Sequence, residues 1–167
     1  LRATAAQGSV FAGFTGDMSG LQNPRSFVLK GPLNIGATFL IPQGKAKFKL
    51  DLRHTSAFLR GQTNAVYLVR IMNDPTGGPT SGQVQMTPSV PAGIQITSMS
   101  GSGWSCTSSV CSRSDVLAAG SNYPAITVLA HVLDVAPASL TFQAGVSGGG
   151  TTGATTANDV TPINSVA

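Results

Sequence analysis

Residues of the types that catalyse reactions are few in this 167-residue chain, and they are scattered along it. Glutamate is absent, and the carboxylates and imidazoles comprise Asp17, Asp51, Asp74, Asp115, Asp134, Asp159, His54 and His131. Glycosidases need two positioned carboxylates, and serine-type hydrolases need a nucleophile motif with a paired base. Neither pattern surrounds these residues, so the sequence predicts a protein that is not an enzyme. We expect His131 on a sheet face and His54 in a turn.

Metal and cofactor binding find little support in the same residues. Calcium prefers carboxylate and carbonyl oxygens, and Asp74, Asp134 and Asp159 could supply them, but no calcium-binding loop motif surrounds them. A zinc site would need more ligands close to the two cysteines, and both histidines are far from them in sequence. We therefore predict no cofactor and no bound metal, with a calcium site as the open alternative.

The two cysteines, Cys106 and Cys111, are separated by four residues in a chain rich in serine and threonine. This spacing favours a local disulfide in a hairpin or loop, because a thioredoxin-like redox pair has two intervening residues. Free thiols are the alternative. The only tryptophan, Trp104, lies two residues before Cys106. We predict that it is a buried anchor packed against the disulfide, and a surface platform for sugar rings is the alternative. Asp115 is expected to cap the turn before Leu117.

Basic residues give the chain a net charge of +4, and several of them alternate along one segment. Lys45, Lys47, Lys49 and Arg53 alternate there with Ala46, Phe48, Leu50 and Leu52. Since the side chains of a strand alternate between its faces, this pattern predicts a half-buried strand with one cationic face, which suits an edge strand. Nucleic-acid sites cluster basic residues with stacking aromatic ones or within a known motif. Neither is present, and we predict no nucleic-acid partner. No run of eighteen apolar residues occurs, so we also predict no membrane span.

A covalent cross-link between strands is a further alternative for these lysines. Sandwich domains of surface proteins sometimes join a lysine of the first strand to an asparagine of the last. Lys45, Lys47 or Lys49 could meet Asn158 or Asn164 in this way. The reaction needs a buried lysine with a lowered pKa, whereas these lysines share the polar face of their strand.

Short segments of alternating hydrophobicity predict the fold. Strands are expected at residues 64–72, 83–88, 94–100, 125–135 and 140–146. Apolar residues occupy both faces of the segment 125–135, which predicts a strand that is buried on both sides. Short strands with turns about every ten residues are typical of sandwiches. The sequence thus predicts an all-β, immunoglobulin-like β-sandwich of about seven strands, with an extended N-terminal segment.

A series of motifs in the second half of the chain carries a family resemblance. In order, they are VPAGI at 90–94, GSGWSC at 101–106, CSRSD at 111–115, LAAGSNYP at 117–124 and VSGGG at 146–150. This series resembles the conserved-repeat domain of bacterial cell-surface proteins, the eleventh family in the series of domains of unknown function. The resemblance covers about residues 45–165. It implies an extracellular immunoglobulin-like module without catalytic activity.

Residues 1–44 lie outside that resemblance, and we predict that they form an extension to a sandwich domain at 45–167. The apolar residues of this extension that we expect to act in assembly are Val10, Phe11, Phe14, Phe27, Val28 and Leu29. Such residues are depleted in disordered segments, so they must pack somewhere. Either they add strands to their own sandwich, or they complete the sheet of a neighbouring subunit as donor strands do.

These expectations combine into a functional hypothesis. We predict a secreted or cell-surface structural protein, the subunit of an extracellular filament that assembles head-to-tail as a homopolymer by strand donation from the N-terminal segment. The alternative is a non-catalytic adhesion or binding module of a larger surface protein, with surface glycans or other surface proteins as partners. Only 10% of the residues are charged, so hydroxyl and amide side chains must cover the surface. We interpret the chain, which starts at Leu1, as a mature product whose export signal has been removed.

Overall fold

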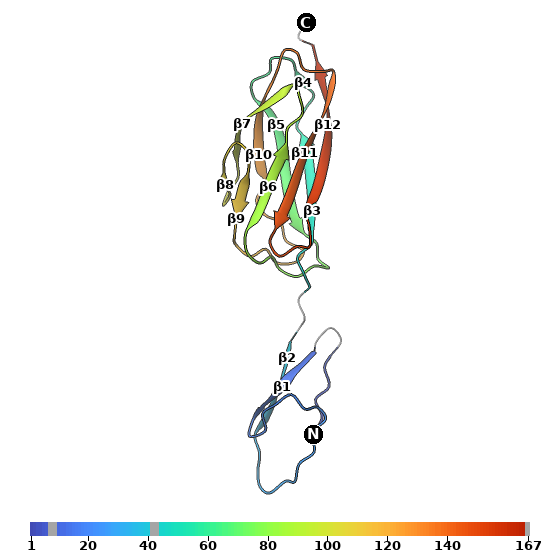
Figure 1. The fold of residues 1–167 in the computed structure, drawn as a ribbon, viewed down its shortest axis with the longest axis vertical. Helices are drawn as coiled ribbons and strands as arrows, with labels where there is room; N and C mark the ends of the chain where they lie inside the picture. The colour runs from blue at the N-terminus through green and yellow to red at the C-terminus, as the bar shows by residue number, and fades with distance from the viewer. Residues whose placement is uncertain (7–9, 41–43, 166–167) are drawn as a thin grey trace. The chain divides into compact units, whose positions relative to one another are not determined.

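The chain divides into two compact units, Leu1–Gln43 and Gly44–Ala167. The computed structural model describes residues 1–6, 10–40 and 44–165. Within these ranges the regular structure consists of strands alone, with no helix (Figure 1). No helix long and apolar enough to cross a membrane occurs in the described part of the chain.

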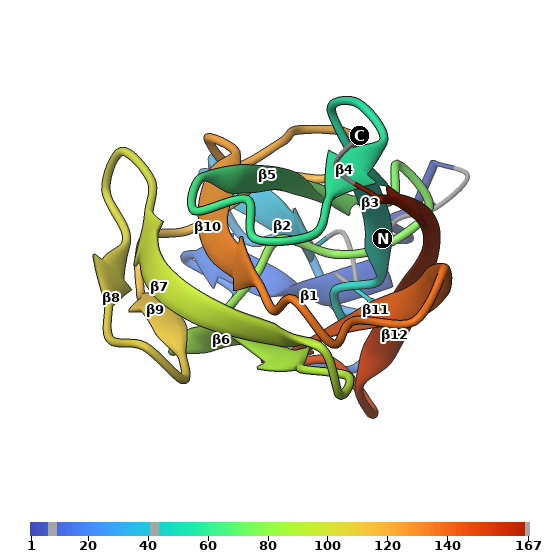
Figure 2. The same cartoon turned by 90° about the horizontal axis from the view of Figure 1, so that it is seen from above.

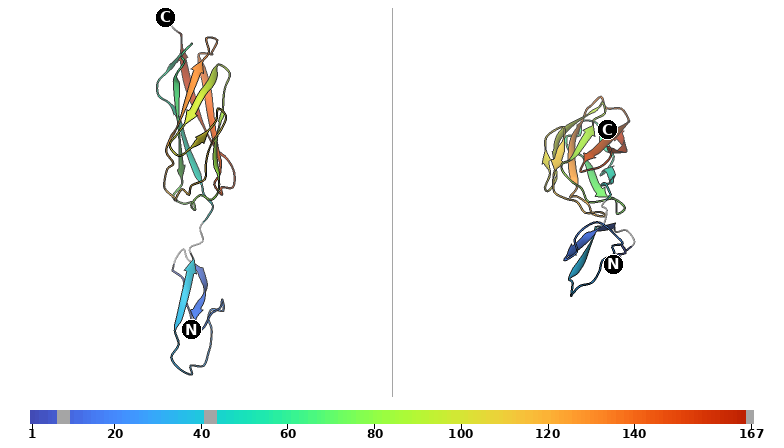
Figure 3. Two further views of the ribbon diagram at one scale, coloured as in Figure 1. Left: turned by 90° about the vertical axis from the view of Figure 1, so that its left-hand side faces the viewer. Right: turned by 60° about the horizontal axis from the view of Figure 1, so that its bottom comes forward.

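The N-terminal unit is built on two antiparallel strands, β1 (Val10–Gly16) and β2 (Ile35–Leu40). The two strands lie side by side at the blue end of the chain (Figure 3). Their register runs from Val10 opposite Leu40 to Gly16 opposite Ile35. The two strands form a sheet of their own. A two-stranded sheet buries little apolar surface and is marginally stable by itself.

The first sheet of the second unit has four antiparallel strands in the order β3-β5-β10-β7. They are β3 (Phe48–His54), β5 (Ala65–Asn73), β10 (Ile126–Val132) and β7 (Ile94–Ser100). Alternate residues of β10 are buried, whereas Thr127, Leu129 and His131 on its other face are only half-buried. The prediction that this strand is buried on both sides was wrong, because its second face is the outer face of the sheet.

The second sheet has six strands in the order β4-β12-β11-β6-β9-β8. They are β4 (Phe58–Leu59), β12 (Thr155–Asn164), β11 (Ser139–Gly148), β6 (Val84–Ser89), β9 (Cys111–Arg113) and β8 (Ser105–Cys106). Glycines close the turn after β11, where Gly149 has a φ of 60°. A Cβ atom there would come within 2.8 Å of Val84 Cγ2 and 3.0 Å of Phe48 Cζ, so both the backbone angle and the space require glycine.

The two sheets face each other and bury the apolar side of each strand between them (Figure 2). At the centre, the Tyr67 ring stacks on Phe142 with centroids 4.3 Å apart, and Phe58 meets it edge-on at 5.1 Å. Seven of the strands in this unit have six residues or more. The predicted all-β, immunoglobulin-like sandwich is confirmed.

The buried hydroxyl of Tyr67 is expected to make the stability of this core sensitive to alkaline pH. It lies 2.9 Å from Thr161 Oγ1, and burial raises the pKa of Tyr67 to about 12, although the bond to Thr161 lowers it. In the unfolded chain Tyr67 loses its proton near pH 10, so between pH 10 and 12 ionisation favours unfolding. We expect the free energy of unfolding to fall there by up to about 1.4 kcal/mol per pH unit from this residue.

The measurement is urea denaturation at pH 9, 10, 11 and 12 for the parent and for Tyr67→Phe. The variant starts from a lower stability, since Thr161 loses its partner, but its decline between pH 10 and 12 should be shallower than that of the parent. Equal slopes would show that Tyr67 does not carry this pH dependence.

Candidate functional site

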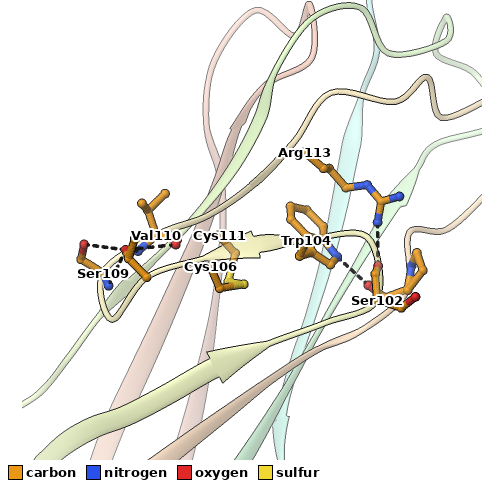
Figure 4. The surroundings of a disulfide bond; sticks show 9 residues. Ser102, Trp104, Cys106, Ser109, Val110, Cys111 and Arg113 are labelled. Atoms are coloured by element: carbon orange, nitrogen blue, oxygen red, sulfur yellow. Dashed lines mark hydrogen bonds between the residues drawn. A yellow bond between two sulfur atoms is a disulfide. The ribbon is translucent and has the colours of Figure 1, made fainter.

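The disulfide lies in a short ribbon at one end of the six-stranded sheet. Cys106 in β8 and Cys111 in β9 face each other in register and are joined by the bond, with a Cα–Cα distance of 4.0 Å (Figure 4). The turn between them is closed by the Thr107 amide, which donates to the Val110 carbonyl at 2.8 Å. The Cys111 side chain is buried within the sandwich core. The bridge therefore fastens a ribbon whose strands are too short to hold it by pairing alone.

Trp104 lies directly before this ribbon and is 9% exposed. Its indole Nε1 donates a hydrogen bond to the Pro124 carbonyl at 2.9 Å, and Tyr123 meets the ring edge-on at 5.4 Å. Gly101 leaves room for the indole, since a Cβ atom at this position would lie 2.7 Å from Trp104 Cδ1. The ring is thus packed on the segment that leads into β10 rather than displayed on the surface.

Arg113 in β9 covers the aromatic pair, and sequence reasoning did not predict this role. Its Cζ atom lies 5.1 Å from the Trp104 centroid, and Figure 4 shows these two side chains together. The same atom lies 4.2 Å from the Tyr123 centroid. The guanidinium is held in place by Asp115, to which Nε and Nη2 each donate at 2.7 Å. The Arg113 guanidinium lowers the pKa of the Asp115 carboxyl. Stacking with a bidentate carboxylate is a geometry that arginine favours.

Asp115 was predicted to cap the turn before Leu117, and this prediction was wrong. Thr80 provides the cap, because its Oγ1 accepts the Leu117 amide at 2.7 Å. The Thr80 hydroxyl is in turn 3.1 Å from the Tyr123 hydroxyl, which donates to the Asp115 carbonyl at 2.7 Å. Burial raises the pKa of Tyr123. A residue distant in sequence supplies the bond that the local pattern assigned to Asp115.

His54 is the last residue of β3 rather than a turn residue, which corrects the prediction. Its Nδ1 lies 2.8 Å from Asp159 Oδ2 in β12, so the pair joins the edges of the two sheets. Within the described residues neither histidine is hydrogen-bonded to a serine, threonine or cysteine. His131 lies on the outer face of β10, as expected. The His54–Asp159 contact acts here as a fastening between sheets.

The aspartates weighed as calcium ligands have separate positions. Asp74 pairs with Lys49 at 2.7 Å, and this contact, followed by bonds from Thr76, lowers the pKa of Asp74. Asp159 pairs with His54. No group of three or more metal-ligating side chains occurs in the described ranges.

The lysines considered for a cross-link also have other neighbours. Lys47 Nζ donates to Thr76 at 3.3 Å, and Lys49 is paired with Asp74. Asn158 accepts a bond from Gln143 at 2.8 Å. The structure therefore gives Lys47, Lys49 and Asn158 other partners than the predicted cross-link requires.

A cavity of about 540 Å³ opens on the outer face of the four-stranded sheet. It is lined by Lys49, Leu50, Asp51, Arg70, Met72, Asn122, Tyr123 and Ala125. Asp51 and Arg70 are cross-strand neighbours, but the Asp51 carboxylate is bound to Arg53 at 2.7 Å. Among the described residues, Arg70 has no carboxylate partner. The cavity has the volume of a small-molecule site and presents one guanidinium that is free to bind an anion.

The apolar residues predicted to act in assembly fall into two groups. Phe14 is buried, and Phe11 packs against it with ring centroids 4.8 Å apart and against Phe39 at 6.0 Å. Val28 and Leu29, in contrast, are 80% and 67% exposed, and Phe27 is exposed as well. The backbone of Val10 pairs with Leu40, while its side chain lies outside the described part of the chain. The first group forms a small core, and only the second offers a surface to a partner.

Comparisons with known proteins give no family for this chain. No family model and no curated protein matches it. A solved structure of the third cohesin of ScaC in complex with the ScaB dockerin from Acetivibrio cellulolyticus aligns at 11% identity and a TM-score of 0.41, over 69% of this chain and 99% of the other. Self-complemented MyfA, the major subunit of Myf fimbriae from Yersinia enterocolitica, aligns at 13% identity with a TM-score of 0.39. The alignment covers 70% of this chain and 98% of the other. Both scores are low, and the fold assignment rests on the sheets of this chain.

Proposed function

We propose that this protein is a secreted or cell-surface structural subunit that polymerises head-to-tail into an extracellular filament, with residues 1–43 as its assembly element. The distribution of exposed large apolar side chains carries the proposal. Seven of the twelve in the described residues lie in the first 43 positions: Leu1, Leu21, Phe27, Val28, Leu29, Leu33 and Phe39. Concentrated apolar exposure marks surfaces that bind another protein, and this unit is only about a quarter of the chain.

The backbone of the same segment supports strand donation. No hydrogen bond joins the backbone of residues 26–33 to the rest of the described chain. This segment has no regular structure of its own, and unpaired amides and carbonyls in an apolar segment are a template for pairing with another sheet. Donation by the N-terminal unit of one subunit to the sandwich of the next is a heterologous contact, and such contacts propagate into fibres when they do not close into a ring.

Other features agree with an exported protein. The chain has one disulfide, of the kind that persists in oxidising compartments. The motif series that resembles the conserved-repeat domain of bacterial surface proteins spans the ribbon with Cys106 and Cys111 and the glycine turn after β11. As part of the proposal, we assign the sandwich to that type of surface module.

The test replaces Val28 and Leu29 together by serine in the full chain. Both side chains are largely exposed, so the variant should fold normally but remain monomeric at concentrations at which the parent polymerises. Sedimentation velocity and electron micrographs of the purified proteins measure this. The matched control replaces Val116 and Val160 by serine, since these sandwich residues are 68% and 64% exposed, and it should polymerise like the parent. A monomeric parent, or normal polymers from the Val28/Leu29 variant, would refute the proposal.

The cavity on the outer sheet face favours one second candidate, a non-catalytic binding module. Its unpaired Arg70 suits a carboxylate-bearing ligand such as an acidic surface glycan. A parent protein that stays monomeric and binds such a glycan, with the binding lost in Arg70→Ala, would favour this function over the filament.

A further inference from the structure

We infer that the acceptor in this assembly is the open edge of β7 at residues 94–96, and that it receives residues 27–29 from a second copy of the chain. The inference rests on the proposed function and names the two backbone edges that would meet. Each sheet of the sandwich ends in edge strands, and a donor can pair only with an edge that has free amides and carbonyls. The edges differ enough in length, charge and proline content for one of them to be selected.

Four of the edges, those of β3, β12, β4 and β8, are poorly suited to this donor. The side chains of β3 include Lys49, Asp51 and Arg53, and charged side chains of this kind protect an edge strand against pairing with an apolar donor. The outer side of β12 already pairs with β4 at its end, and Pro162 within it removes an amide. The remaining edges, β4 and β8, are two residues long.

The β7 edge lacks all of these protections. Its seven residues, IQITSMS, include no charged residue and no proline, and its only partner in the described chain is β10. A bulge at Thr97 divides it, because the register with β10 shifts between Ile96 and Ser98. After Ser100 the chain turns at once into β8, so the second half of β7 lies beside that ribbon (Figure 1). The open half is therefore residues 94–96.

Charge at the start of β7 complements the donor and sets its direction. The Leu133 amide donates to the Gly93 carbonyl at 2.8 Å, which places the following Asp134 beside the Ile94 end of the edge. The Asp134 side chain is exposed and has no ion pair within the described ranges. In an antiparallel pairing the Lys30 end of the donor meets this end of β7, and Lys30 approaches Asp134. Val135, which is 85% exposed, offers an apolar contact at the same end.

Disulfide trapping between two single variants tests the pairing. The native cysteines are bonded to each other and no other cysteine is present, so Val28→Cys and Gln95→Cys each introduce the only free thiol. When the two full-length variants are mixed and gently oxidised, we expect dimers in which most linked peptides join position 28 to position 95. The matched control mixes Val28→Cys with Lys49→Cys on the β3 edge and should give at least tenfold less of that heterologous link. A link between 28 and 49 at equal yield would overturn the inference.

The double variant Val28→Cys/Gln95→Cys distinguishes a second copy from the same chain. Pairing between copies should give a ladder of disulfide-linked oligomers on a non-reducing gel. An oxidised monomer without a ladder would show that the chain fills its own edge, and it would overturn the assignment to a second copy.

A charge reversal gives a readout that does not depend on new thiols. Asp134→Lys should raise severalfold the protein concentration needed for polymerisation. Adding Lys30→Asp to this variant should return that concentration to the parental value. Asp51→Lys on β3 should have little effect on it. If the Val28/Leu29 serine variant abolishes polymers but the 28–95 link and the Asp134 effect are absent, the acceptor is wrong and the filament proposal stands. If the parent forms no polymers, both the filament proposal and the assignment of β7 as the acceptor are refuted.

Discussion

Replacement of Trp104 by alanine is expected to lower the free energy of unfolding by about 3–5 kcal/mol, as for other large-to-small changes at buried sites. The indole is 9% exposed, contacts Tyr123 edge-on and donates to the Pro124 carbonyl. Its removal would also leave Arg113 without one of its two aromatic contacts. Urea denaturation of parent and variant, with equal m-values required for the comparison, measures the loss.

Two further measurements separate the contributions at this site. Trp104→Phe keeps a ring and loses the indole N–H, so it should lower the free energy of unfolding clearly less than Trp104→Ala does. Reduction of the Cys106–Cys111 bond should cost only about 1–2 kcal/mol, because the loop it closes is short. If Trp104→Ala left stability unchanged and abolished binding to sugars, the ring would be a ligand platform and the structural interpretation would be wrong.

Local periodicity predicted the sandwich well, because burial on one side of a sheet produces alternation that can be read within a few residues. The strand predicted at residues 94–100 has those bounds in β7, and the alternation of Leu140, Phe142, Ala144 and Val146 is the buried side of β11. The outer face of β10 misled the same reasoning. Leu129 on that face is apolar but only half-buried, and composition cannot tell which side of a strand meets the opposite sheet.

Contacts between distant segments could not be predicted. Asp115 has the chemistry of a turn cap, but its carboxylate binds Arg113, and Thr80 from another loop caps Leu117. His54 was predicted in a turn, whereas it ends β3 and meets Asp159, which is 105 residues away in the sequence. Similarly, the apolar residues of the N-terminal unit were recognised as a set, but only the fold shows that Phe14 is buried and Val28 is exposed. A polar pair carries no local period that would reveal its partner.

Asn73 was not identified from the sequence, although a signal was present. It continues the inward alternation of Tyr67, Val69 and Ile71 on β5, and a polar residue at an inward position must find hydrogen bonds. Its side chain is fully buried and joins three segments. Oδ1 accepts the Lys47 amide at 3.1 Å, and Nδ2 donates to the Gly78 carbonyl at 2.8 Å and the Leu117 carbonyl at 3.1 Å.

Asn73→Ala is expected to lower the free energy of unfolding by about 3 kcal/mol, because two buried carbonyls and the part-buried Lys47 amide lose their partner, and a buried group costs about 1–3 kcal/mol when it is left unpaired. The backbone of Asn73 also bonds to Ser121 and Gly120, so the loss should loosen the loop around residues 117–121. Urea denaturation measures the loss of unfolding free energy. Hydrogen exchange of the Lys47 and Leu117 amides measures the local loosening.

Two variants decide whether the bonds or the packing at Asn73 matter. Asn73→Leu refills the volume without any polar atom, so it should be nearly as unstable as alanine if the unpaired groups cause the loss. Asn158→Ala is the control, because Asn158 makes a single side-chain bond to Gln143 at the surface, and such surface changes usually stay within about 0.5 kcal/mol. Recovery of parental stability by leucine would mean that the cavity, rather than the three hydrogen bonds, explains the alanine result. Buried polar groups that lie where a strand and loops converge cost little stability when they are hydrogen-bonded and much when they lose a partner, and Asn73 is such a residue.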